Sequence, residues 1–198
     1  RIMPSTVYED AAFEHGYRVI VGIDEAGRGT WAGPVYAGAV CLTYTRASLD
    51  SIARALDGVT DSKQLTARQR AHLLETIQGA VAAHGIGSAS SAEIDALGIV
   101  PATKLAMARA LDMLSLTPDY LLLDTMGWRE YSGNAVLHSI KYGDQQALSI
   151  SAASILAKTA RDAYMQALAE RYPLYGFATH KGYGTPAHRE ALKAYGVT

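Results

Sequence analysis

Short hydrophobic runs separated by polar turns predict a sheet of five strands. Each run is almost continuously apolar, which is typical of strands buried within an α/β protein. The predicted strands cover 17–24, 35–44, 81–90, 120–124 and 135–140. The short connection between the first two strands predicts an antiparallel hairpin.

Helical periodicity predicts the remaining elements. The expected helices cover 8–15, 49–56, 66–78, 91–116 with a break at 98–101, 146–171 and 186–195. A capping box begins the third helix, with Thr66 and Gln69 in the required T-x-x-Q spacing. Small residues at 149–153 permit close backbone approach on the longest helix. We therefore expect one α/β domain over 1–198, with 172–198 forming a loop-rich C-terminal flank.

Acidic residues occur where predicted elements end or begin. Asp24 and Glu25 follow the first strand, Asp124 closes the fourth, and Asp144 precedes the long helix. Neighbouring side chains point to opposite faces inside a strand, so we expect the first strand to end at Asp24, where both acids can converge. Strand ends of α/β sheets lie beside one another, which predicts that the four acids gather in one crevice.

Four converging carboxylates repel one another unless cations neutralise them. Oxygen ligands without His or Cys favour Mg²⁺ or Mn²⁺. Two such ions about 3.5–4 Å apart support phosphodiester hydrolysis. The pattern thus predicts a carboxylate-bound metal site for phosphate chemistry. For any single acid the alternative is a surface charge or a helix cap, and capping is a serious alternative for Asp144.

Composition limits which binding partners and which cellular compartment are expected for this protein. The 198 residues carry a net charge of −1, so any binding site for a polyanion must be local. No apolar run approaches the roughly 20 residues of a membrane span. The single cysteine, Cys41, cannot form an internal disulfide, which favours a reducing compartment such as the cytoplasm. No P-loop and no G-x-S-x-G elbow occurs.

Basic side chains supply the candidate polyanion site. Lys158, Arg161 and Asp162 are typical of a solvated helix face, and Lys158–Asp162 is an ordinary i,i+4 pair. If that face borders the acids, its two basic residues join a rim able to hold phosphates. The other members of this rim are Arg28, Lys63 and Lys181.

Five longer patterns follow one another along the chain. They are D-E-A-G-R-G-x-x-A-G-P-V from Asp24, D-S-K-x-L from Asp61, L-L-L-D ending at Asp124, G-D-x-x-x-L-S-I-x-A-A-S-I-L-A-K-x-x-R-D from Gly143, and Y-P-x-Y-G-F-x-x-H-K-G-Y-G-T-x-x-H from Tyr172. Together they resemble bacterial ribonuclease HII. The resemblance implies a ribonuclease H-like fold, a mixed five-stranded sheet flanked by helices, with a C-terminal helical flank that clamps substrate.

The resemblance also implies an activity. It is metal-dependent endonucleolytic cleavage of RNA in RNA/DNA hybrids and of single ribonucleotides within duplex DNA, as in ribonucleotide excision repair. The cut would fall 5′ of the ribonucleotide and leave 3′-hydroxyl and 5′-phosphate ends. Two alternatives stay open: another two-metal nuclease on this fold, such as a junction resolvase, and a non-catalytic hybrid-binding protein. We expect a monomer, and no residue identifies a contact with a sliding clamp.

Site residues carry over by motif. The metal-binding, catalytic acids would be Asp24, Glu25, Asp124 and Asp144. The backbone of Gly27, Arg28 and Gly29 would contact the 2′-hydroxyl that separates RNA from DNA. Tyr183 would stack on the sugar at the RNA–DNA junction. Phosphate contacts are expected from Ser62, Lys63, Lys141, Lys158, Arg161 and Lys181.

The sequence departs from the family pattern at several positions. Tyr142 stands where a lysine usually precedes Gly-Asp, and Lys141 lies one residue earlier. Thr30 and Trp31 replace the commoner Pro-Leu, and Ser151 interrupts an alanine run. Family members often continue into a basic H-R-R tail beyond the position of Thr198.

Overall fold

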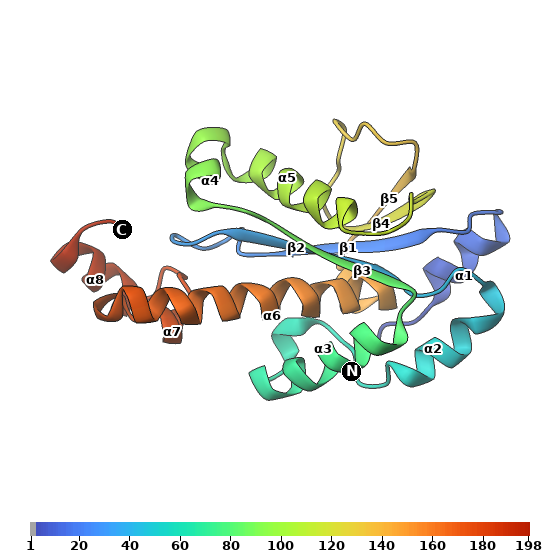
Figure 1. Ribbon diagram of the computed structural model, residues 1–198, viewed down its shortest axis with the longest axis horizontal. Helices are drawn as coiled ribbons and strands as arrows, with labels where there is room; N and C mark the ends of the chain where they lie inside the picture. Colours follow the sequence, from blue (N-terminus) through green and yellow to red (C-terminus); the bar gives the residue numbers. More distant parts are fainter. Residues whose placement is uncertain (1–2) are drawn as a thin grey trace.

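A five-stranded mixed sheet forms the centre of the computed structural model, which describes residues 3–198 (Figure 1). The strand order is β3-β2-β1-β4-β5. The first three strands pair antiparallel, whereas β4 and β5 run parallel to β1. The strands are β1 (Ile20–Ala26), β2 (Val35–Cys41), β3 (Ala83–Ala89), β4 (Tyr120–Asp124) and β5 (Val136–Ile140). The predicted mixed five-stranded sheet is confirmed.

Helices cover both faces of the sheet (Figure 1). One face carries α1 (Val7–Glu14), α2 (Leu49–Ala55), α3 (Ala67–Ala80) and the long α6 (Leu148–Arg171); the other carries α4 (Ser91–Leu97) and α5 (Ile99–Asp112). Helix α6 extends beyond the sheet toward α7 (Phe177–His180) and α8 (Pro186–Tyr195). No helix within 3–198 is long and apolar enough to cross a membrane.

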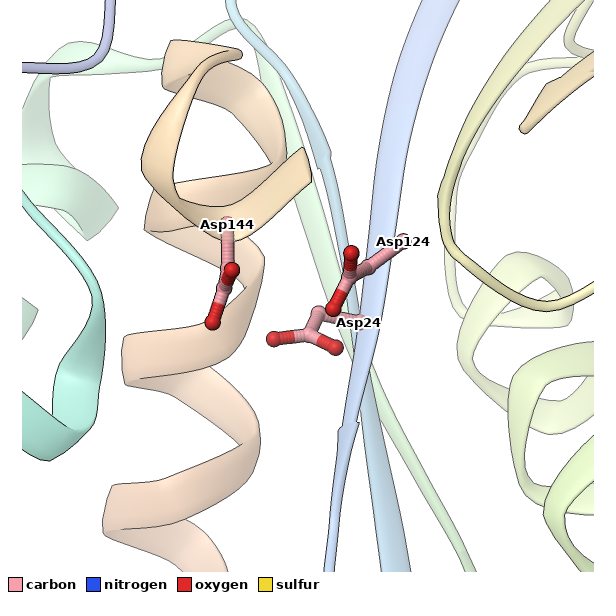
Figure 2. A group of neighbouring side chains, drawn as sticks. All are labelled: Asp24, Asp124 and Asp144. Atoms are coloured by element: carbon pink, nitrogen blue, oxygen red, sulfur yellow. The ribbon is translucent and has the colours of Figure 1, made fainter. Parts of the chain in front are cut away.

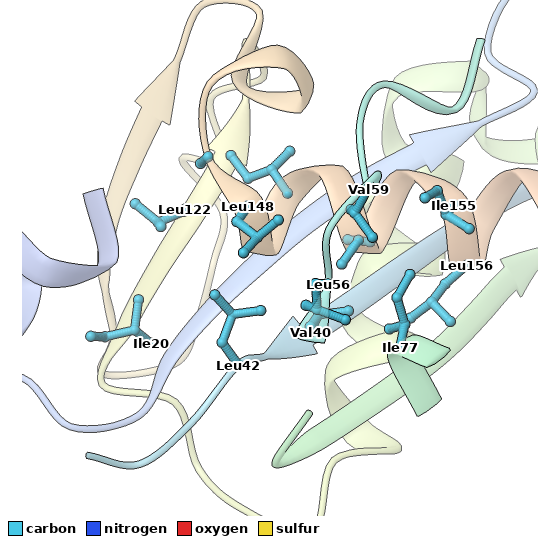
Figure 3. Close-up of a cluster of buried hydrophobic side chains, with 14 of the residues drawn as sticks. Ile20, Val40, Leu42, Leu56, Val59, Ile77, Leu122, Leu148, Ile155 and Leu156 are labelled. Carbon is cyan, nitrogen blue, oxygen red and sulfur yellow. The ribbon is translucent and has the colours of Figure 1, made fainter. Parts of the chain in front are cut away.

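Alternation along β1 divides its side chains between two hydrophobic clusters. Val21 and Ile23 face the α5 side, whereas Ile20 packs on the α6 side (Figure 3). Period-two geometry therefore directs Gly22 and Asp24 toward α6. The sheet thus presents one acid of β1 to the helix that follows Asp144.

The strand β1 does not end at Asp24, so that prediction was wrong. Asp24 pairs with Gly38 of β2, and Glu25 pairs with Ala37, which carries the strand through to Ala26. Because the hydrogen-bonded ladder continues through both acids, their side chains stay on opposite faces. The first strand also begins later than expected, at Ile20.

The other elements match their predictions within a few residues. The capping box at Thr66 and Gln69 is present in α3, and Gly98 separates α4 from α5. The stretch expected to be irregular after Tyr172 contains the short helix α7. Helix α8 has the predicted bounds.

Two strand glycines allow α6 to lie directly against the sheet. An ideal Cβ on Gly22 would lie 2.4 Å from the Ser149 carbonyl carbon, and one on Gly38 would lie 2.3 Å from the Ala153 carbonyl oxygen. The expectation of close backbone approach at 149–153 is confirmed. This contact fixes the distance between β1 and the turn that carries Asp144.

Gly38→Ala is expected to destabilise the fold by about 1–3 kcal/mol, the usual cost of overpacking a rigid site. The added methyl would meet backbone atoms of α6, which cannot rotate away. Gly79→Ala in α3 is the matched control, because its Cβ meets nothing within 4 Å. It should be neutral or stabilise by up to about 1 kcal/mol through helix propensity. Urea unfolding of both variants measures the difference, and equal midpoints would contradict the proposed contact.

Candidate metal centre and substrate loops

Three aspartates from three separate elements meet at one point (Figure 2). One carboxylate oxygen from each of Asp24, Asp124 and Asp144 lies within 4.8 Å of the others. The parallel pairing of β1 with β4 sets Ile23 opposite Leu123, which places the next residues, Asp24 and Asp124, side by side. Asp144 approaches from the single-turn 3-10 helix η3 (Gly143–Gln145), just before α6.

Backbone geometry around β4 holds the Asp124 carboxylate. Its Oδ1 accepts hydrogen bonds from the Gly143 N–H at 2.6 Å and from the Thr125 hydroxyl at 3.0 Å. Thr125 has a φ of 52°, a strained value for a β-branched residue. Such strain persists only where surrounding contacts enforce it. The turn after β4 is therefore shaped to orient this acid.

Burial and mutual repulsion raise the pKa values of Asp24 and Asp144. Burial, followed by the charges of Glu25 and Asp124, raises the pKa of Asp24 well above its usual range. Burial, then Asp124, raises the pKa of Asp144 to about 6, although Lys63 partly opposes this. A hard divalent cation would remove this repulsion, and three carboxylate oxygens are the donors it prefers. The cluster thus fits a metal ion.

Glu25 does not belong to the three-carboxylate cluster. It follows Asp24 on the opposite face of β1, and its Oε1 accepts a hydrogen bond from Arg28 at 3.1 Å. Its other oxygen, Oε2, is buried without a hydrogen-bond partner in the described structure. Burial raises the Glu25 pKa, while Arg28 opposes the rise. The predicted convergence is therefore seen for three acids, and the metal role of Glu25 stays a prediction.

Asp144 is not a helix cap, which removes the main alternative for this residue. The N-cap of α6 is Ala147, and no side chain caps it. The Asp144 carboxylate instead faces Lys63, whose Nζ lies 3.4 Å from Oδ2. The side chain of Lys63 is 73% exposed, so it can also reach a ligand above the acids.

The loop holding Lys63 is tied to α6 by Arg70, which the sequence analysis missed. The buried Arg70 donates to the carbonyls of Ser62 and Leu65 and forms an ion pair with Asp162 at 2.9 Å. Ser62 itself is buried, and its N–H donates to Ser154 Oγ. No local pattern could reveal Arg70, because its partner Asp162 lies 92 positions away.

The Gly-Arg-Gly loop follows β1 directly. Gly27 has a φ of +106° and lies against Arg161, since a Cβ there would be 2.3 Å from Arg161 Nε. A Cβ at Gly29 would meet nothing within 4 Å. Gly27 therefore serves packing inside the protein, while the backbone at Gly29 is open to an approaching ligand.

Arg161 is fully buried, which corrects the expectation of a solvated helix face. Its guanidinium donates to oxygens inside the protein, including the carbonyls of Pro34 and Lys181. A direct phosphate contact by Arg161 does not fit this position. Lys158 forms the predicted pair with Asp162 at 2.5 Å, and its Nζ lies 5.9 Å from the centre of the Tyr183 ring.

The two other lysines expected to contact phosphate, Lys181 and Lys141, differ in how far their side chains are held by the protein. Lys181 donates to Gln166 Oε1 and to the Ala178 carbonyl. Lys141 is exposed, and its Nζ lies 5.2 Å from the centre of the Tyr142 ring. Tyr142 adopts the left-handed conformation with a φ of 56°. The structure shows no direct contact between Lys141 and the acids among the described residues.

Tyr183 stands at the edge of the same region. The residue is 40% exposed, its N–H donates to the His180 carbonyl, and its carbonyl oxygen lies within hydrogen-bond distance of His188 Nδ1. The backbone is thus fixed, and the ring lies near Lys158 and Arg161 while the residue stays partly exposed. This is the arrangement expected of a stacking platform.

The ribonuclease HII family model matches residues 21–198. The chain belongs to the ribonuclease HII family. Ribonuclease HII of Roseiflexus castenholzii is 48% identical over 98% of this chain and 85% of that protein. Ribonuclease HII of Bacillus subtilis is 45% identical over 98% of this chain and 71% of that protein. The resemblance inferred from the five motifs is confirmed.

Solved structures agree with this assignment. The crystal structure of ribonuclease H2 from Pyrococcus horikoshii superposes with a TM-score of 0.73 at 27% identity, over 89% of this chain and 86% of that one. The predicted ribonuclease H-like fold is therefore confirmed. As a member of the ribonuclease HII family, the chain is a ribonuclease H, a nuclease that hydrolyses RNA in RNA/DNA hybrids.

Proposed function

We propose that this ribonuclease HII cleaves single ribonucleotides embedded in duplex DNA as well as longer hybrids, with a divalent metal, 5′ of the ribonucleotide. The three-carboxylate cluster beside the open Gly29 backbone carries this proposal. An enzyme that cuts at a single ribonucleotide needs two things. It needs a centre that hydrolyses the phosphodiester bond, and it needs backbone groups close enough to contact the 2′-hydroxyl.

The proposed metal is Mg²⁺ or Mn²⁺, held by Asp24, Asp124 and Asp144. Glu25 would be a further ligand, because its charge lies close enough to Asp24 to raise the pKa of that carboxyl. When bound, such ions would activate water and stabilise the leaving oxygen. Lys63 would neutralise charge beside Asp144 and contact phosphate. The hydrogen bonds from Gly143 and Thr125 would keep the Asp124 carboxylate oriented.

Substrate contacts follow from the loops around the cluster. We propose that Gly27, Arg28 and Gly29 contact the 2′-hydroxyl and that Tyr183 stacks on the adjoining sugar. Residues 172–198 would form a clamp on one side of the duplex, supported by the cluster of Met165, Tyr175, Phe177 and Ala191 that joins this segment to α6. The predicted monomeric state and cytoplasmic location stay predictions.

Cleavage of a duplex with one ribonucleotide tests the proposal. With Mg²⁺ or Mn²⁺, we expect a single cut 5′ of the ribonucleotide and 3′-hydroxyl and 5′-phosphate ends on sequencing gels. The matched all-DNA duplex should not be cut, because it lacks the 2′-hydroxyl. A protein that cuts four-way junctions without any ribonucleotide would instead be a resolvase. Tight binding of hybrids without turnover in either metal would contradict a catalytic role.

Tyr183→Ala should reduce kcat/KM on the single-ribonucleotide duplex by about fivefold to 100-fold, since stacking on an aromatic ring contributes roughly 1–3 kcal/mol. The loss on a continuous hybrid should be smaller, because every position there offers a ribose. Tyr44→Ala is the control, as Tyr44 is similarly exposed at 43% but lies outside the substrate loops. Equal losses on both substrates would make Tyr183 a packing residue.

A further inference from the structure

Arg161 is a buried cation that forms no ion pair with any carboxylate among residues 3–198. It is 0% exposed. Its Nε donates to the Pro34 carbonyl at 2.9 Å and its Nη1 to the Lys181 carbonyl at 2.8 Å. Its Nη2 donates to Thr30 Oγ1 at 3.0 Å and to the Ala32 carbonyl at 3.1 Å. Burying a charge against neutral acceptors costs free energy. The acceptors of Arg161 show which segments its guanidinium holds in place.

The acceptors belong to two segments that are distant in sequence. One is the loop 27–34, which follows β1, and the other is the loop 181–185, which carries Tyr183. Gly27 lies directly on the guanidinium, where a side chain would not fit. Arg161 therefore lies beneath both loops and touches the backbone of each.

Thr30 connects Arg161 to the Gly-Arg-Gly turn. Its hydroxyl accepts from Arg161 Nη2 and donates to the Gly27 carbonyl at 2.8 Å. The proline that is commoner at this position has no side-chain hydroxyl and could make neither bond. The departure at position 30 thus strengthens the link between the loop and α6.

Trp31 and two glycines join the loops directly. The Trp31 N–H donates to the Gly182 carbonyl at 2.9 Å. A Cβ on Gly182 would lie 2.3 Å from the Ala32 carbonyl oxygen, and one on Gly184 would lie 2.4 Å from the Trp31 ring. The two loops therefore pack without any gap that a side chain could fill.

We propose that Arg161 is a positioning residue that acts through Thr30 and the Lys181 carbonyl to fix the Gly27-Arg28-Gly29 turn at a set distance from Tyr183. This inference rests on the proposed substrate roles of those two loops. A single ribonucleotide must contact both the Gly27-Arg28-Gly29 turn and Tyr183 at one step of the duplex. If the distance between these two elements is already fixed, no free energy is lost in ordering them when substrate binds. A continuous hybrid offers a 2′-hydroxyl at every step and depends less on that spacing.

Thr30→Val tests the link with little change in shape. We expect kcat/KM on the single-ribonucleotide duplex to fall about tenfold, the size of one hydrogen bond to a charged group. The loss on a continuous hybrid should be several-fold smaller. Thr30→Ser, which restores a hydroxyl, should recover most of the activity. Equal losses on the two substrates, or no rescue by serine, would overturn the proposal.

Thr159→Val is the matched control. It makes the same replacement on α6, two residues from Arg161, at a hydroxyl that has no hydrogen-bond partner in the described structure. Its activity on both substrates should equal that of the wild-type protein. A loss as large as that of Thr30→Val would show that the effect is not specific to the Arg161 link.

Hydrogen exchange separates this inference from the proposed function. In Thr30→Val and in Arg161→Lys, amides of both 27–34 and 181–185 should exchange faster, while Mn²⁺ binding stays unchanged. Acceleration confined to the mutated loop would overturn the proposed coupling. If the wild-type protein fails to cut the single-ribonucleotide duplex, the proposed function fails, yet the exchange experiment still decides whether Arg161 couples the loops.

Discussion

Asp24→Asn is expected to remove nearly all cleavage and, in the absence of metal, to make the protein more stable. Mutating an outer-shell partner of a metal ligand typically costs about 10–100-fold, so loss of a proposed ligand should cost at least about 100-fold. The same carboxylate is buried, and its pKa is raised by burial and by Glu25 and Asp124. Replacing it with a neutral amide of nearly equal shape removes this repulsion.

The gain in stability follows from the energetics of ionising the cluster. Each unit by which the fold raises a carboxyl pKa costs about 1.4 kcal/mol once that group must ionise. A change of 1 kcal/mol shifts Tm by roughly 2–4 °C in a domain of this size. We therefore expect a Tm several degrees above wild type in EDTA at neutral pH, measured by circular dichroism.

Asp95→Asn is the control for Asp24→Asn, because Asp95 is an exposed carboxylate on α4, across the sheet from α6. It should change neither activity nor Tm. Metal should raise the Tm of the wild-type protein but much less that of Asp24→Asn. Wild-type activity in Asp24→Asn would reject this residue as a ligand, and a lower Tm without metal would contradict repulsion in the cluster.

The second large effect is that bound metal should reverse the way in which the stability of the protein depends on pH. The pKa of Asp144 is raised from 3.8 to about 6, so the folded protein holds this proton over a range where the unfolded chain has released it. The metal-free protein should therefore lose stability as pH rises from about 4 through 6. The pKa of Asp24 is shifted in the same direction by burial and by the charges of Glu25 and Asp124, so this residue adds to the loss.

Metal binding requires the deprotonated acids and should reverse this trend. In Mn²⁺, stability and cleavage should both rise with pH, and the rate should fall about tenfold for each pH unit below the apparent pKa. Thermal melts at pH 4.5 and 7, each with EDTA or with Mn²⁺, measure the inversion. Asp144→Asn should show a weaker pH dependence in EDTA. Identical slopes with and without metal would contradict a metal site at these acids.

Local patterns were enough to predict the elements of this fold. The apolar runs identified the five strands, and the capping box at Thr66 identified the start of α3 within a residue. These signals are local because the hydrogen bonding and burial of a single element depend mainly on residues near in sequence. The order of the motifs also predicted the ribonuclease HII family before any contact was known.

Side-chain direction at the site was predicted less well. The sequence showed that Asp24 and Glu25 are adjacent, and the glycines after them suggested that the strand ends there. The β2 partner carries the ladder past both acids, so Asp24 joins Asp124 and Asp144 while Glu25 pairs with Arg28. Whether a strand continues depends on its neighbour, which lies elsewhere in the chain.

The sequence alone was enough to identify the family and the candidate residues of its site, since acids, glycines and lysines recur in an order that one family shares. Their placement and partners became visible only in the folded protein. It turned Arg161 from an expected surface cation into the buried support of two loops, and it gave Thr30 and Trp31 partners. The physical reason is that burial and hydrogen bonding of a long polar side chain depend on elements that meet only when the chain folds.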